Sequence, residues 1–145
     1  MAASSINFDL LPTIPEGWSI RTKDQISSRL RGEWSFDKID TGVYLSKKQT
    51  GRKLISGWDL REELSNQPVM GRNLLDFCLE YRYMIPSEWK QDGLAIFFWG
   101  TIYHSYGDES ELYVHFLFWY RNTWNWSYRW LGSTWGKMSP ALIYI

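Results

Sequence analysis

The sequence is poor in cysteine and in long apolar segments, and both shortages exclude classes of protein. Cys78 is the only cysteine among 145 residues, which rules out an intramolecular disulfide and favours a reducing compartment, most simply the cytoplasm. The longest apolar run, at 94–99, is far shorter than the ~20 residues that a membrane helix needs. The N-terminal segment has neither a basic stretch nor a long apolar one, so no signal peptide is expected. We therefore expect a cytoplasmic chain with no membrane association.

The sequence also lacks an excess of charge of either sign. Sixteen basic residues balance sixteen acidic ones, and the absence of a basic excess disfavours a nucleic-acid partner. Arginines do flank the aromatic segment, as single-stranded nucleic acid would require, but Arg129 is predicted on the face opposite the tryptophans. With 44% hydrophobic and 22% charged residues, the composition is typical of a globular protein. The length predicts one domain over 1–145, with 1–17 as an irregular lead-in.

Histidine is scarce, and its positions support one catalytic hypothesis. His104 is predicted at the turn end of a strand near Asp108, and it faces Glu111 in the strand register predicted below. A histidine paired with a carboxylate suits general acid–base catalysis, so His104 with Glu111 or Asp108 could serve a small hydrolase or nuclease. The chain has no Cys/His cluster and no HExxH motif. We therefore expect no metal ion and no cofactor, and the balance leans away from an enzyme.

Aromatic residues, in contrast, are abundant. The chain has ten tryptophans, five of which lie at or after residue 119. Every second residue from 124 to 130 is aromatic, a period of two that places these rings on one face of a β-strand. The sequence therefore predicts an antiparallel meander of three strands and two tight turns, in the order 94–103, Gly107–Asp108, 112–120, Arg121–Asn122 and 123–131.

Two-residue loops at both turns define the register of this meander. Gly100 then faces His115, and His115 faces Tyr128. A glycine in mid-strand leaves a gap beside its partner. The gap is either a small pocket lined by His115, Tyr128 and Trp126 or, in the interpretation that we favour, a space filled by a neighbouring ring.

The first two strands of the meander are apolar on both faces, so each face needs a cover. Leucines recur at helical spacing in 58–82, which predicts one helix that ends by Pro68 and a second helix at about 70–82. These helices can cover one face of the sheet. The N-terminal hairpin, a curled sheet or a second subunit could cover the other.

Further local signals complete the expected fold. A capping box at 22–25 predicts a short helix at about 23–31, and turn residues bound short strands within 33–56. The segment 140–145 is expected to add a last strand to the main sheet. Together these features predict an α+β fold, namely a mainly antiparallel sheet made of the aromatic-rich meander 94–131 and an N-terminal hairpin, with two to three helices packed on it.

Four segments together resemble small uncharacterised proteins from bacterial lineages of reduced genome. These segments are Trp58–Leu64, Ile85–Lys90, Phe98–Tyr103 and the tryptophan-rich 119–130. The resemblance covers about residues 54–141, and it implies no activity, ligand or catalytic residue.

The aromatic sheet favours a non-enzymatic binding or interaction module that uses a sheet face or edge against a protein, peptide or sugar partner. The candidate binding residues are Trp119, Trp124, Trp126, Tyr128, Trp130 and His115. Because each ring buries roughly 150–250 Å², most of them are expected in the core. Trp124 and Trp130, near the strand ends, are the rings expected to remain accessible. The alternatives are the small hydrolase or nuclease, and a self-associating structural protein such as a homodimer.

Overall fold

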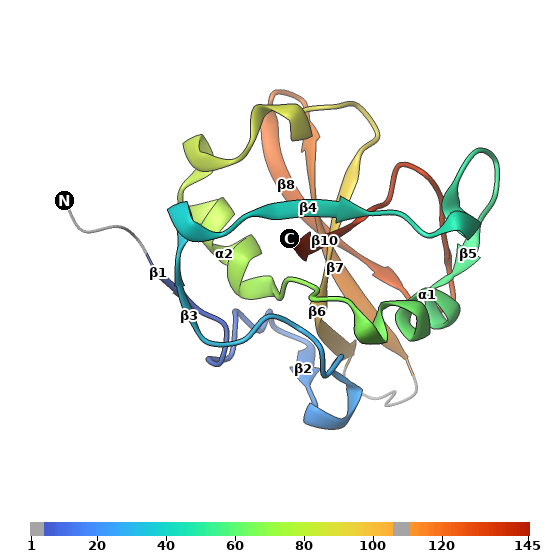
Figure 1. Ribbon diagram of the computed structural model, residues 1–145, viewed down its shortest axis with the longest axis horizontal. Helices are drawn as coiled ribbons and strands as arrows, with labels where there is room; N and C mark the ends of the chain where they lie inside the picture. Colours follow the sequence, from blue (N-terminus) through green and yellow to red (C-terminus); the bar gives the residue numbers. More distant parts are fainter. Residues whose placement is uncertain (1–4, 106–110) are drawn as a thin grey trace.

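The long strand β6 (Ala95–Ser105) lies at the centre of a six-stranded sheet (Figure 1). The computed structural model describes residues 5–105 and 111–145. The main sheet is antiparallel apart from the pairing of β10 with β6, and the predicted α+β fold with a mainly antiparallel sheet is confirmed. In spatial order the strands are β4 (Thr41–Tyr44), β10 (Ala141–Tyr144), β6, β7 (Leu112–Tyr120) and β8 (Thr123–Trp130), with β2 (Trp18–Ile20) paired to the end of β6.

The hairpin of β7 and β8 has the predicted register. Arg121 and Asn122 both have positive φ angles, 51° and 60°, as a two-residue turn that follows the twist of the strands requires. The turn places Trp119 opposite Trp124 and His115 opposite Tyr128. Since a slip of one residue would send every ring to the other face, this turn fixes which side chains share a face of the hairpin.

The pairing of β6 with β7 differs from the prediction in two ways: it is displaced by one residue at the turn end of the hairpin, and β6 contains extra residues in its middle. Phe97 pairs with Phe116 and Ile102 with Val114, so four residues of β6 lie opposite a single residue of β7. The prediction that Gly100 faces His115 is therefore wrong. Within this irregular segment the Gly100 amide donates to the backbone oxygen of Met70, at 3.0 Å. Beyond the segment, the register shift reverses the alternation of β6 side chains between the two faces of the sheet.

Two helices cover opposite faces of the main sheet (Figure 1). α1 (Gly57–Glu63) begins at Ser56, whose hydroxyl accepts a hydrogen bond from the amide of Asp59. α2 (Arg72–Glu80) begins at Gly71, which has no side chain to cap it. The leucines of α2 pack with Ile96, Phe98 and Leu117, and Leu60 of α1 packs with Phe97, Trp99 and Val114. The two apolar faces of β6 and β7 thus belong to two cores, with one helix on each.

The predicted helix at 23–31 is wrong, because Gln25 bonds to the sheet instead of capping a helix. Its side-chain oxygen accepts from the amide of Ile102 and its side-chain nitrogen donates to the oxygen of Ile102, both at 2.7 Å. Only a single 3-10 turn forms there, at Thr22–Asp24. The other 3-10 turns are Phe36–Lys38, Lys47–Gln49, Leu64–Asn66, Arg82–Met84 and Ser87–Trp89.

The short strands of 33–56 pair with distant segments rather than with one another. β3 (Glu33–Ser35) pairs with β1 (Ser5–Asn7), and β4 pairs with β10. β5 (Ile55–Ser56) pairs with β9 (Thr134–Trp135). The described strands of 33–56 thus do not form a hairpin with one another, and the lead-in supplies β1. The predicted final strand is confirmed as β10. Among the described helices, none is long and apolar enough to cross a membrane.

Candidate functional site

The rings of the aromatic stripe change from buried to exposed along β8. Trp124 is 4% exposed and packs in the α2 core, so the prediction that it stays accessible is wrong. Trp126 and its neighbour Trp119 on β7 are half-buried. Tyr128 and Trp130 are 49% and 45% exposed, and the expected accessibility of Trp130 is confirmed. The open part of the stripe is therefore its C-terminal end.

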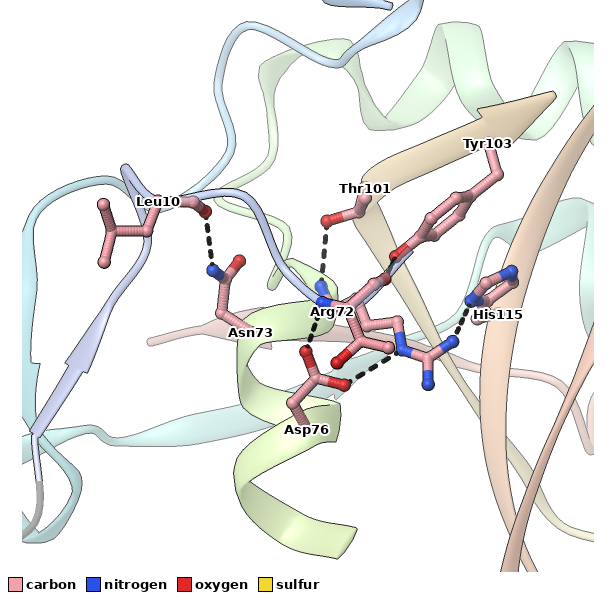
Figure 2. Close-up of polar contacts among 8 residues, drawn as sticks. Leu10, Arg72, Asn73, Asp76, Thr101, Tyr103 and His115 are labelled. Atoms are coloured by element: carbon pink, nitrogen blue, oxygen red, sulfur yellow. Dashed lines mark hydrogen bonds and ion pairs between the residues drawn. The ribbon is translucent and has the colours of Figure 1, made fainter. Parts of the chain in front are cut away.

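A buried arginine lies beneath the half-buried part of the stripe. Arg72, at the first turn of α2, is 3% exposed, and its guanidinium lies 4.1 Å from the ring centroid of Trp126. Figure 2 shows its two polar partners, Asp76 on α2 and His115 on β7. Arg72 Nε donates to Asp76 Oδ1 at 3.2 Å, and Arg72 Nη1 lies 2.7 Å from His115 Nδ1. The cation is thus neutralised inside the chain.

The arginine also determines the state of His115. Because a guanidinium can only donate, Nδ1 of His115 must accept, and the neutral ring carries its proton on Nε2. Burial, and then the charge of Arg72, lower the pKa of His115 to about 3. Nε2 has no hydrogen-bond partner among the described residues. This histidine is a neutral structural acceptor at ordinary pH.

Neighbouring rings fill the space around His115, whereas the space beside Gly100, which the sequence had placed opposite His115, is occupied by the backbone of Met70 and Gly71. The ring of Tyr103 stacks on the imidazole at 3.9 Å between centroids, and that of Trp18 lies edge-on to it at 5.5 Å. Burial raises the pKa of Tyr103, whose hydroxyl donates to the backbone oxygen of Thr13. His115 itself has no exposed surface, so it cannot contact a ligand in this conformation.

The side chain of Thr101 on β6 caps the helix that carries Arg72. Thr101 Oγ1 accepts the Arg72 amide at 2.9 Å (Figure 2), which satisfies one of the free donors at the start of α2. A side chain at Gly100 would meet the backbone nitrogen of Gly71 at 2.6 Å. The irregular segment of β6 and the N-terminus of α2 therefore fit together because Gly100 lacks a side chain.

The structure does not bring together the predicted acid–base pair. His104 pairs across the hairpin with Leu112 rather than Glu111, because the register is displaced by one residue. Its ring contacts the Ser19 hydroxyl, with Nε2 at 2.7 Å, while Glu111 accepts from the Tyr113 hydroxyl. The third candidate, Asp108, lies outside the described residues. Within the described residues the catalytic hypothesis for His104 thus lacks its contact with Glu111, and the pairing with Asp108 stays a prediction.

Other groups with catalytic or metal-binding potential are also few. Burial raises the pKa of the Cys78 thiol to about 12, and a thiol that stays protonated is a poor nucleophile. Within 5–105 and 111–145, no three histidine, cysteine or acidic side chains are placed to hold a metal ion.

The outer edge of β8 is open at Trp126 and Tyr128. β8 is the terminal strand of the main sheet. The two residues that flank a two-residue turn exchange hydrogen bonds, and along the hairpin hydrogen-bonded pairs then alternate with non-hydrogen-bonded pairs. The backbone groups of Trp126 and Tyr128 therefore point away from β7. No hydrogen bond among the described residues reaches them.

Two contacts limit this open edge. Arg82 Nη1 donates to the backbone oxygen of Trp124 at 2.8 Å, and the Ser133 amide donates to that of Trp130 at 2.9 Å. The free edge therefore spans the middle of β8, beside the exposed ring of Tyr128.

The other face of the β7–β8 hairpin carries a cavity of about 580 Å³, which we call the Arg129 groove. It is lined by 92–95, Phe116, 118–121 and Arg129. The lining is largely apolar and aromatic, with two arginines, Arg129 and Arg121, and one acidic residue, Asp92. In size it matches sites that hold small organic ligands, roughly 300–1,000 Å³.

Arg129 is held rigidly at the wall of this groove. Its guanidinium carbon lies over three rings, with centroid distances of 4.7 Å to Phe97, 5.1 Å to Trp135 and 5.6 Å to Phe116. Nη1 donates to Ser139 Oγ at 2.9 Å and lies 3.4 Å from the backbone oxygen of Thr134. Burial lowers the pKa of Arg129, and no carboxylate among the described residues forms an ion pair with it.

Sequence reasoning missed both the Arg72 cluster and the Arg129 groove. A signal for the first was present: Arg72 opens a helix, where a cation is unfavourable, and Asp76 follows one turn later. The groove had no local signal, because 92–95 and Arg129 come together only through the pairing of β6, β7 and β8. Comparison of the chain with protein-family models, curated proteins and solved structures gave no match.

Proposed function

We propose that the chain is a binding module that accepts an extended peptide at the outer edge of β8. The observation that carries the proposal is the open backbone of Trp126 and Tyr128 on a terminal strand of eight residues. A peptide added there gains main-chain hydrogen bonds for affinity and side-chain contacts at alternate positions for specificity.

The side chains at this edge are suited to a partner. Sheets commonly protect such edges with lysine, proline or a bulge, and β8 contains none of these. The half-exposed rings of Tyr128 and Trp130 lie on one face of the strand. Exposed tyrosine and tryptophan supply contact area at low cost in conformational entropy, and are enriched in interfaces.

The test separates the backbone from the ring at one position. Peptides are first selected from a random library on the purified chain. Their affinities for Tyr128→Ala, which keeps the amide, and Tyr128→Pro, which loses it, are then compared. Proline is tolerated where the amide faces away from the sheet. We expect Tyr128→Pro to bind about three- to tenfold more weakly than Tyr128→Ala, the effect of one hydrogen bond.

Amide hydrogen exchange gives a second measurement on the unmodified chain. A bound peptide should slow exchange at Trp126 and Tyr128 and leave the exposed turn at Asn122 unchanged. Equal affinities for the two variants together with unchanged exchange would contradict the proposal. A dimer in light scattering that Tyr128→Pro dissociates would assign the edge to a second copy of the chain and would likewise overturn it.

A further inference from the structure

We propose that the Arg129 groove binds a small apolar carboxylate, with the carboxylate on Arg129 and the apolar body on the rings of β7. This site goes beyond the proposed function, because it uses a face of the hairpin rather than the edge of β8. The two sites depend on different groups, so either proposal can fail without the other.

Arg129 leaves several hydrogen-bond donors of its guanidinium unused among the described residues. A guanidinium carries five N–H donors in a fixed plane, and among the described residues only Nη1 of Arg129 has acceptors. Nε and Nη2 make no hydrogen bond there, and neither is among the fully buried unpaired atoms. These two nitrogens form the side of the guanidinium that binds a carboxylate through two parallel hydrogen bonds.

The positive charge of Arg129 also has no counterion among the described residues. A partly desolvated cation without a counterion is costly, and an opposite charge brought to it in a site of low polarity interacts strongly. Arg72 has Asp76 for this purpose, whereas Arg129 has no such partner within the described chain. Asp92 also lines the groove, but it forms no ion pair with Arg129 and does not contribute to its pKa shift. An anionic ligand would supply the missing charge.

The guanidinium of Arg129 is already held in place before a ligand binds. Rings on one side and Ser139 on another hold the guanidinium plane, so little side-chain entropy remains to be lost on binding. Part of the cavity lining is apolar: it includes Leu94, Ala95 and the half-buried rings of Phe116 and Phe118. A ligand with one carboxylate and a flat apolar body satisfies both parts.

The experiment compares an acid with its neutral analogue. 2-Naphthoate and 2-naphthamide have nearly the same shape and differ in charge, and each is titrated into the isotope-labelled chain and followed by amide NMR shifts. We expect the acid to bind at least about tenfold more tightly than the amide, since a charge-assisted pair exceeds a neutral one by that factor. The largest shifts should fall on Ala95, Phe116 and Phe118.

Two variants assign the preference to one arginine. Arg129→Met keeps an apolar side chain of similar length and should abolish the preference for the acid. Arg121→Met removes the exposed cation at the rim of the groove and should change the affinity less than about threefold. The preference and the shifts are measured on the unmodified chain, so the test remains decisive even if Arg129→Met does not fold.

Three outcomes would overturn the proposal. The first is no saturable binding of 2-naphthoate at millimolar concentration. The second is equal affinity for acid and amide, which would leave an apolar cavity without an anion site. The third is an acid preference that survives in Arg129→Met or disappears in Arg121→Met, which would place the carboxylate elsewhere.

Discussion

The two faces of the β7–β8 hairpin each carry a guanidinium packed on aromatic rings, and the two groups differ in what neutralises them. Arg72 lies over Trp126 and reaches both Asp76 and His115. Arg129 lies over three rings and, among the described residues, donates only to a hydroxyl and a backbone oxygen. The first arginine completes a polar cluster inside the fold. The second leaves donors unused at the wall of a cavity, so only the second can serve a ligand.

The largest expected effect is the loss of Arg72. In Arg72→Met, Asp76 loses its cation and Nδ1 of His115 becomes a buried acceptor without a donor. Removing one partner of a buried pair destabilises strongly, so we expect the free energy of unfolding to fall by about 3 kcal/mol. Urea denaturation followed by circular dichroism measures this change. A loss of unfolding free energy no larger than that of Arg129→Met would show that the two arginines contribute equally to stability.

The next effect concerns the backbone that positions Arg72. An alanine at Gly100 would place its Cβ 2.6 Å from the nitrogen of Gly71, and backbone atoms cannot move aside as a flexible side chain can. We expect Gly100→Ala to lower the free energy of unfolding by about 1–3 kcal/mol. Gly136→Ala is the matched control, because its Cβ would meet only the flexible side chain of Leu54, at 3.1 Å. Equal losses in the two variants would refute the packing argument.

How much the sequence could predict differs between the two hairpins of the meander. Arg121 and Asn122 define a two-residue turn, and alternation then fixes the register of β7 and β8, which was predicted correctly. The predicted register of β6 and β7 was wrong by one residue at the turn end, and the extra residues in the middle of β6, where Gly100 contacts Met70, changed it further. That contact joins segments 30 residues apart along the chain, and no local pattern reveals it.

The candidate sites were predictable to a similar, partial extent. Alternation of polar and aromatic residues correctly placed Arg129 opposite the tryptophans, but it could not show that Arg129 lacks a counterion. Burial along the stripe was predicted for some rings and not others. Trp124 is buried in the hydrophobic cluster that also contains the leucines of α2, and its burial depends on this tertiary arrangement rather than on its place near a strand end.

The third prediction uses acid to weaken the Arg72 cluster selectively. The pKa of His115 is about 3 in the folded chain and 6.5 in the reference state, so between these values the unfolded chain binds the proton more readily. The contribution of His115 to stability is complete above pH 6.5 and is lost as the pH falls toward 3, by at most about 1.4 kcal/mol per pH unit.

The measurement is the free energy of unfolding at a series of pH values for the unmodified chain and for His115→Gln. Carboxyl groups titrate in the same range in both proteins, so the difference between the two curves isolates the histidine. The glutamine oxygen can still accept from Arg72, and the variant should therefore fold with a shallower dependence on pH. Parallel curves would mean that His115 is not held neutral by burial and by Arg72.

The smallest expected effect on stability is the loss of Arg129, and it is the sharpest test of the comparison. Arg129→Met retains packing on the three rings and removes a partly desolvated charge that no carboxylate of the described residues neutralises. Replacing such a charge with an apolar group is often neutral, so we expect the free energy of unfolding to change by less than about 1 kcal/mol. Arg121→Met controls for the change in net charge. If Arg129→Met instead lost as much stability as Arg72→Met, its guanidinium would have a counterion within the chain, and the reason for expecting a ligand there would disappear.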